Sequence, residues 1–251
     1  MKIATYNIWN SQQGMPARKD HIIREIRKVD ADVICLQEVS NRALANHIAT
    51  AAGYPYVFFD HYLNEDEGLC ILSRLKFEEC GSWMEHSNSV YVCIKQNSKQ
   101  IGVINLHLPW DRVKKREKQI VQITAFADRI KADWVCLAGD FNGSENADVH
   151  RFLTGECQLE QEECNPRWYD LAFSYAQRRG NEAECTLNFR KNPRFLRNTI
   201  EENLRADRIL LRNPYPNDFP ALVSCDIFGE TVYEETKLCA SDHYGVVTEI
   251  L

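Results

Sequence analysis

Carboxylate and imidazole side chains occur in this sequence where apolar, strand-like runs begin or end. Glu38 lies at the end of one such run, Asp140 follows another, and His243 precedes the run that starts at Tyr244. Because the ends of several strands meet at one rim of a sheet, we expect these side chains to lie close together. Carboxylates and a histidine gathered at one rim are what metal-assisted phosphate chemistry requires.

The tetrapeptide Gly139-Asp140-Phe141-Asn142 carries the most specific pattern. The glycine permits a sharp turn, and on an extended backbone Asp140 and Asn142, two residues apart, would point the same way. A carboxylate beside an amide can take a proton from water and hold that water in place. The alternative is a turn in which the aspartate side chain binds its own backbone. We favour the catalytic interpretation because the preceding run is so apolar.

His243 is suited to contact a phosphoryl oxygen, either by donating a hydrogen bond or by sharing a proton. Such a histidine needs a carboxylate on its other ring nitrogen to fix its tautomer and charge. Asp207, which opens the strand-like run Arg208–Leu211, is the candidate for this carboxylate. The alternative for Asp207 is an ion pair with one of the neighbouring arginines.

Glu38 is a candidate ligand for Mg²⁺, which takes few protein carboxylates and keeps waters for the phosphate. Asn7 holds the comparable place in the first strand, although asparagine there is also a common turn residue. His107 stands in an otherwise apolar strand, where a core histidine is the alternative. We interpret it as a catalytic residue because its strand is directed at the same rim. Asn105 shares its strand face and is a candidate substrate ligand.

Strand-like and helix-like stretches alternate along the chain, which predicts an α/β fold. No linker rich in Pro, Gly or Ser interrupts residues 1–251, so we expect a single domain. The segment Cys157–Asn203 is polar and irregular, and predicts a long functional loop with short helical pieces. Expected strands are Lys2–Trp9, Val33–Val39, Tyr56–Phe59, Leu69–Ser73, Val90–Lys95, Gln100–Leu108, Trp134–Ala138, Arg208–Leu211, Ala221–Asp226 and Tyr244–Ile250, with helices opening at Pro16 and covering Asn41–Ala52 and Asp111–Lys131.

Composition excludes few classes of protein. The formal net charge is −6, so no global field draws the chain to nucleic acid or to an anionic membrane. The ten cysteines contain no C-x-x-C pair and several sit in apolar runs, which predicts free thiols. No leader precedes the first strand and no apolar run approaches membrane-spanning length. We therefore expect a cytoplasmic protein without a transmembrane segment, and a monomer.

The motifs, taken in order, resemble those of the endonuclease/exonuclease/phosphatase superfamily. Any one of them is weak, whereas all of them in the family's order, from residue 5 to residue 245, are specific. They are Thr5-Tyr6-Asn7-Ile8-Trp9, Leu36-Gln37-Glu38-Val39, Gly68-Leu69-Cys70-Ile71-Leu72-Ser73-Arg74, Asn105-Leu106-His107-Leu108, Gly139-Asp140-Phe141-Asn142, Ala206-Asp207-Arg208-Ile209-Leu210 and Ser241-Asp242-His243-Tyr244-Gly245.

The resemblance implies a four-layer α/β sandwich, with two packed mixed β-sheets flanked by helices. It implies hydrolysis of a phosphoester by in-line attack of water with Mg²⁺, for which Mn²⁺ can substitute. The roles it assigns are Glu38 on the metal, Asn7 at the metal or phosphate, Asp242 near the metal, Asp140 with Asn142 on the attacking water, and His243 on the phosphate with Asp207 behind it.

Differences from the motifs of some superfamily members indicate which branch of the superfamily this sequence resembles. The segment after the first strand and the histidine at position 107 differ from those of abasic-site endonucleases. The motifs Asp207-Arg208-Ile209 and Ser241-Asp242-His243-Tyr244-Gly245 are more similar to those of tyrosyl-DNA phosphodiesterase-like and neutral sphingomyelinase-like members. We therefore expect a phosphodiesterase. A non-catalytic domain that keeps the fold is the competing class, but it would have lost site residues that this chain retains.

The substrate is indicated by a basic stretch ahead of Asp207. Arg190 and Arg194 lie in it beside Phe189 and Phe195, an interleaving that suits bases stacked on aromatics with phosphates on arginine. This favours a nucleic acid or related phosphodiester as partner. A solvated basic loop, a lipid headgroup as in sphingomyelinases, or a sugar or inositol phosphate are the alternatives.

Overall fold

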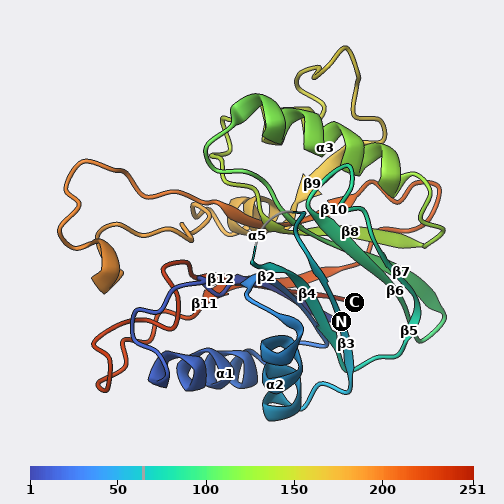
Figure 1. The fold of residues 1–251 in the computed structure, drawn as a ribbon. Helices are drawn as coiled ribbons and strands as arrows, with labels where there is room; N and C mark the ends of the chain where they lie inside the picture. The colour runs from blue at the N-terminus through green and yellow to red at the C-terminus, as the bar shows by residue number, and fades with distance from the viewer. Residues whose placement is uncertain (64–65) are drawn as a thin grey trace.

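The computed structural model describes residues 1–63 and 66–251 as two six-stranded mixed β-sheets packed face to face (Figure 1). Helices α1 and α2 cover the outer face of one sheet and α3 covers the outer face of the other. The helix–sheet–sheet–helix order is the four-layer sandwich that the motifs predicted. That prediction is confirmed.

The first sheet has the strand order β11-β12-β1-β2-β4-β3, and only β1 and β2 run parallel. Strand β1 lies in the middle and is buried along almost its whole length, which explains its apolar sequence. The strands are β1 (Lys2–Asn7), β2 (Val33–Val39), β3 (Tyr56–His61), β4 (Gly68–Ser73), β11 (Leu222–Phe228) and β12 (Gly245–Ile250).

The second sheet has the order β5-β6-β7-β8-β10-β9, and β7 and β8 form its parallel pair. Its central strands β7 and β8 lie against β1 and β2 of the first sheet. The strands are β5 (Phe77–Ser82), β6 (Ser89–Gln96), β7 (Lys99–His107), β8 (Trp134–Asp140), β9 (Trp168–Asp170) and β10 (Asp207–Arg212).

Three apolar clusters fill the spaces between these layers. One joins the inner faces of the two sheets, one lies under α1 and α2, and one lies under α3 and α4. The helices are α1 (Ala17–Val29), α2 (Arg42–Ala52), α3 (Val113–Ala127), α4 (Asp148–Leu153) and α5 (Leu171–Arg178), with a 3-10 turn η1 (Pro193–Phe195). Helix α5 packs against β10 and β11, across the edge of the sandwich.

A capping residue and a glycine set the two ends of α2 where the sequence predicts them. The side chain of Asn41 accepts the N–H of Leu44 and caps α2, and Gly53, at a φ of 80°, ends it. The strand expected over Trp134–Ala138 continues past Gly139, because β8 ends at Asp140. A Cβ at Gly139 would come within 2.0 Å of the carbonyl oxygen of Leu106, so this glycine allows β7 and β8 to approach closely.

Strands β5 and β9 and helix α4 were not predicted, whereas α5 and η1 are short helical pieces of the kind expected within Cys157–Asn203. Strand β5 is an edge strand with an exposed or half-exposed face, so its sequence lacks an apolar run. Strand β9 and helix α5 lie within Cys157–Asn203, which the sequence presents as irregular. Within residues 1–63 and 66–251, no helix combines the length and the apolar character needed to cross a bilayer.

All ten cysteines are free in the structure, and Cys80 is the exposed one. Burial raises the pKa of the Cys136 thiol to about 12 and that of Cys93 to about 11, which makes their thiolates scarce. We therefore expect an alkylating agent to modify Cys80 first in the native protein. All ten should become modifiable after unfolding without reductant, as counted by mass spectrometry. Cysteines that stay unmodified until a reductant is added would contradict this expectation.

Candidate active site

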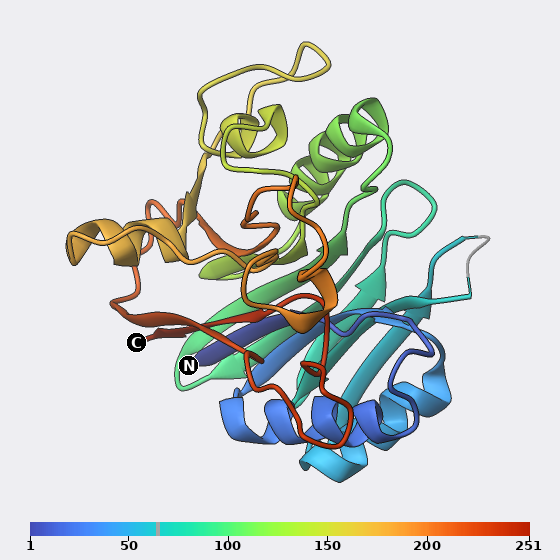
Figure 2. The same cartoon turned by 90° about the vertical axis from the view of Figure 1, so that its left-hand side faces the viewer.

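The predicted catalytic side chains converge from strand ends of both sheets. Figure 2 shows these two sheets stacked between the blue helices on one side and a green helix on the other. The register of the second sheet explains much of this convergence. Strand β7 places His107 beside Asp140 on one side, and β10 places Asp207 beside Asp140 on the other. From the first sheet, Asn7 at the end of β1 reaches across to the same aspartate.

Asp140 lies at the centre of the site and is 1% exposed. Its Oδ1 accepts the backbone N–H of Asn142 at 2.8 Å, and its Oδ2 accepts the side-chain amide of Asn7 at 3.1 Å. The Nε2 atoms of His107 and His243 lie 3.6 and 3.8 Å from the same Oδ2. Burial opposes ionisation, but the two histidines and the hydrogen bonds outweigh it and lower the pKa of Asp140. The carboxylate is therefore ionised.

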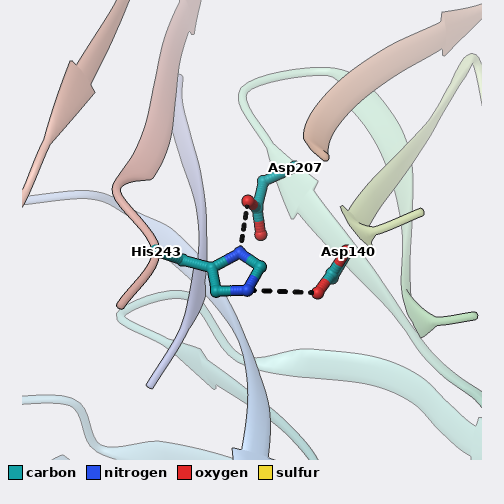
Figure 3. A group of neighbouring side chains, drawn as sticks. All are labelled: Asp140, Asp207 and His243. Atoms are coloured by element: carbon teal, nitrogen blue, oxygen red, sulfur yellow. Dashed lines mark hydrogen bonds and ion pairs between the residues drawn. The ribbon is translucent and has the colours of Figure 1, made fainter. Parts of the chain in front are cut away.

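His243 and Asp207 form a buried hydrogen-bonded pair, with Nδ1 and Oδ2 2.8 Å apart (Figure 3). Burial lowers the pKa of His243, but the charges of Asp207 and Asp140 outweigh it and raise that pKa well above its ordinary value. An imidazolium held this way directs its Nε2 toward Asp140 and the centre of the site. The pairing of His243 with Asp207 is the one the sequence analysis anticipated; Asp207 forms no ion pair with Arg205 or Arg208 among the described residues.

The Asp140–Asn142 segment is a turn and not extended, so that part of the sequence analysis was wrong. Asn142 has a φ of 47°, and the hydrogen bond from its N–H to the Asp140 side chain closes the turn that was the alternative interpretation. The Asn142 side chain donates to the carbonyl of Leu108 at 2.9 Å. Both residues still line the same edge, because the turn fixes the Asp140 carboxylate instead of competing with it.

Glu38 is turned to the site by an irregularity in β2. The pairing of β2 with β4 shifts register between Leu36 and Val39, and Glu38 adopts a φ of 57°. Its Oε1 accepts the Asn7 amide and its Oε2 accepts the backbone N–H of Asn10, both at 2.8 Å. A non-glycine residue in this conformation is strained and is typical of functional positions.

Asn7 connects the two sheets at the site. Its Nδ2 donates to both Glu38 and Asp140, while its Oδ1 accepts the N–H of Trp9 at 3.0 Å. The oxygen that a metal ion would take is therefore bound to the backbone. In this structure the Asn7 Nδ2 bridges the two carboxylates.

Asp242 lies beside Glu38 on the open side of the site. Its Oδ1 accepts the hydroxyl of Ser241 at 3.2 Å and its Oδ2 lies 3.7 Å from Nε of Arg194. Burial raises the pKa of Asp242; His243 opposes this rise and the charge of Glu38 adds to it. Two partly open carboxylates that repel each other are a donor set that fits a hard divalent cation such as Mg²⁺ or Mn²⁺.

Asp140, Asp207 and His243 also lie close enough to share an ion, since one donor atom from each falls within 4.8 Å of the others. Their hydrogen bond and charges already compensate one another (Figure 3). A set that contains an imidazolium suits proton transfer better than it suits Mg²⁺. The carboxylate side of the site, at Glu38 and Asp242, is therefore the part whose donors could hold such a cation.

Two residues that support the site were not predicted. The hydroxyl of Tyr62 lies 2.9 Å from Nδ1 of His107 and fixes that ring. The hydroxyl of Thr186 accepts the N–H groups of Ala206 and Asp207, both at 3.1 Å. Neither residue lies in one of the motifs. Tyr62 follows β3, which carries no motif, and Thr186 lies within the irregular segment Cys157–Asn203. Only the sheet register and the loop path could have revealed them.

Asn105 is buried behind the site and does not line it. Its Oδ1 accepts the amide of Gln37 at 2.7 Å, and its Nδ2 donates to the carbonyls of Leu36 and Cys70. All of these partners belong to the opposite sheet, so Asn105 joins the two sheets. A fully hydrogen-bonded amide with 0% exposure cannot contact a substrate, so the predicted role is wrong.

The two predicted basic residues behave differently. Arg194 reaches the site and stacks over the ring of Trp9, 4.2 Å from its centroid. Arg190 donates instead to the carbonyls of Asn198 and Glu201 and braces its own loop.

The aromatic pair of that loop does not offer a stacking surface for bases. The rings of Phe189 and Phe195 pack on each other, with centroids 4.5 Å apart, and Phe189 is buried. The expectation that this pair receives bases is therefore wrong.

Comparison with known proteins agrees with this geometry. Residues 4–243 match the model of the Endonuclease/Exonuclease/phosphatase family. Among solved structures, D. rerio TDP2 humanised by 14 mutations has a TM-score of 0.76 at 18% identity, covering 100% of this chain and 98% of that one. D. rerio TDP2 complexed with a single-strand DNA product has a TM-score of 0.75 at 18% identity, covering 100% of this chain and 98% of that one.

The beta toxin of Staphylococcus aureus gives a TM-score of 0.71 at 16% identity, with 99% of each chain covered. At sequence identities of 16% and 18%, these structural similarities show a shared fold and nothing further. A comparison with curated proteins finds no match.

Proposed function

The chain belongs to the Endonuclease/Exonuclease/phosphatase family, and we propose that, as a phosphoesterase of this family, it hydrolyses phosphodiesters with a divalent cation. One observation carries the proposal. An ionised Asp140 is surrounded by His107, His243 and Asn7 beside the partly open carboxylates of Glu38 and Asp242. These residues come from both sheets, so we propose that residues 1–251 act as one catalytic domain.

Asp140 is the group that would orient and deprotonate the attacking water. Its carboxylate is buried and ionised, and the Asn142 N–H holds one of its oxygens in place. His243 would donate from Nε2 to a phosphoryl oxygen as negative charge grows there, and Asp207 keeps that ring protonated and correctly turned. His107, fixed by Tyr62, is placed to donate to the same phosphoryl group.

Glu38 and Asp242 would hold Mg²⁺ or Mn²⁺. A bound divalent ion supplies Lewis-acid stabilisation of charge on the phosphoryl and leaving oxygens. The chain's own contribution is to keep Glu38 in place through Asn7 and the Asn10 N–H. Arg194, on the other side of Asp242, is positioned to contact a substrate phosphate.

A panel of phosphodiesters and phosphomonoesters, assayed with Mg²⁺, with Mn²⁺ and with a chelator, tests the proposal. We expect metal-dependent turnover of diesters in preference to monoesters. An absence of metal-dependent turnover on every substrate would reject an enzymatic role and favour a binding domain. Turnover that survives the chelator would reject the role of the cation.

Glu38→Gln is expected to raise the Mg²⁺ concentration needed for half-maximal binding by about tenfold or more, since even outer partners of metal ligands contribute 10–100-fold. Calorimetric titration of the metal without substrate measures this directly. Glu78→Gln makes the same chemical change on the exposed edge strand β5 and should bind as the wild type does. Equal affinity in the two variants would remove Glu38 from the metal site.

A further inference from the structure

A cavity of about 470 Å³ opens beside the reaction centre. The half-buried Glu38 and His107 of the site line it together with the exposed Trp110, Arg112 and Lys115. The cavity therefore adjoins the catalytic groups and also includes residues that the catalytic site does not use.

Trp110 is 79% exposed, yet the loop that carries it is held firmly. The nearly buried Arg116 donates to the carbonyls of Pro109 and Trp110 at 3.1 and 3.4 Å. One step earlier in the chain, the N–H of Leu108 donates to the carbonyl of Asp140 at 2.9 Å. The backbone that carries the exposed indole is therefore held relative to the catalytic aspartate, and a ligand that stacks on the indole would not have to order the loop first.

The surroundings of Trp110 are cationic although the chain is acidic overall. Exposed lysines at positions 114, 115 and 118 follow Arg112 at the start of α3, against the carboxylates of Asp111 and Glu117. Asp111 lies 3.3 Å from Arg112 and offsets part of its charge. Of these cations, Arg112 and Lys115 line the cavity beside Trp110, together with the carboxylates of Glu38, Glu67 and Asp111.

We propose that this cavity is a subsite for the nucleotide unit next to the scissile phosphate, with the base stacked on Trp110 and a flanking phosphate on Arg112 and Lys115. The inference rests on the proposed phosphodiesterase function. Base–aromatic stacking tolerates any base, so the subsite would favour single strands without reading sequence. The buried Phe189 cannot serve this purpose, which leaves Trp110 as the aromatic at the mouth of this cavity.

The polarity of the cavity favours a nucleotide over a lipid. Glu38, Asn88 and Asp111 line it together with Trp110, and an acyl chain placed there would desolvate these polar groups without pairing them. A membrane-docking surface would instead need a broad apolar face beneath its basic residues.

The experiment compares three substrates, a single-stranded thymidine hexamer, the same backbone with abasic units, and the small diester methyl p-nitrophenyl phosphate. Trp110→Ala should lower kcat/KM on the thymidine hexamer about tenfold to a hundredfold, the range that stacking of one base supplies. The same variant should leave both other substrates unchanged, and Trp110→Phe should recover most of the loss. Tyr215→Ala, which removes an aromatic side chain that is 82% exposed outside this cavity, is the matched control.

The double variant Arg112→Ala, Lys115→Ala should lower kcat/KM on both hexamers and reduce the log–log salt slope by about 1.4, or about 0.7 for each lost phosphate contact on a single strand. If the small diester is hydrolysed but Trp110→Ala acts equally on both hexamers, the subsite is refuted while the phosphodiesterase function stands. If no diester is hydrolysed, the function itself fails. Loss of binding to anionic vesicles by Trp110→Ala, with unchanged hexamer kinetics, would refute the subsite and assign the surface to membranes.

Discussion

His243→Ala is expected to lower kcat by roughly 10²–10⁴-fold while KM changes little, because the ring acts on charge that develops in the transition state. Asp207→Asn should show a smaller loss of the same kind, since it removes the carboxylate that keeps His243 protonated and oriented. Steady-state kinetics on a diester at saturating Mg²⁺ measure both effects.

His150→Ala is the matched control for this prediction. His150 is a half-buried histidine that is likewise bound to an aspartate, with Nε2 3.2 Å from Oδ2 of Asp170, but it lies outside the catalytic cluster. Its variant should keep the wild-type kcat. A His243→Ala protein with native circular dichroism and wild-type kcat would remove His243 from the mechanism.

Asp170→Asn is expected to lower the free energy of unfolding by about 3–5 kcal/mol, the usual effect of breaking a buried ion pair. Asp170 is 4% exposed and its Oδ2 accepts Arg205 at 2.6 Å, with Arg208 3.6 Å away. Without the carboxylate, two buried guanidinium groups would face each other uncompensated. Asp148→Asn, which breaks an exposed pair with Arg151, should cost only about 0–1 kcal/mol in the same urea titration.

The contribution of Asp170 to the free energy of unfolding should also decrease at acidic pH. Burial opposes ionisation, but the hydrogen bond from His150 and the charges of Arg205 and Arg208 outweigh it and hold the pKa of Asp170 well below its usual range. A depressed pKa stabilises the folded state above the unfolded value of about 3.9 and loses this effect as pH falls below it. The wild-type advantage over Asp170→Asn should therefore be constant from pH 7 to 5 and shrink toward pH 3. An advantage that grows on acidification would contradict the assignment.

The fold was predictable where burial dictates the sequence. Strand β2 is covered on both faces, so its apolar run marks Val33–Val39 without error. Helix α2 carries its own cap and its own terminating glycine. Strand β5 and the short helix α4 lie at an edge and an end of the sandwich, where mixed exposure leaves no clear apolar period.

The site was predictable as a set of strand ends but not as a set of contacts. That Asp140 sits between His107 and Asp207 depends on register between strands far apart in sequence. The same register decides that Asn105, two residues before His107, points to the opposite sheet and not to a substrate. Tyr62 could not be found from any local pattern, because its partnership with His107 arises only when both sheets have packed.

The position of β12 has a consequence for the timing of synthesis. This strand is made after every other strand of the sandwich, yet it inserts between β11 and β1, about two hundred and forty residues from its partner β1 in sequence. Contacts of such separation form slowly, since the chain entropy of closing the loop must be overcome first. Asp242 and His243 directly precede β12, so they reach the site only when it docks. A nascent chain therefore cannot bring Asp242 and His243 to Asp140 and Asp207 until β12 has left the ribosome and paired with β1.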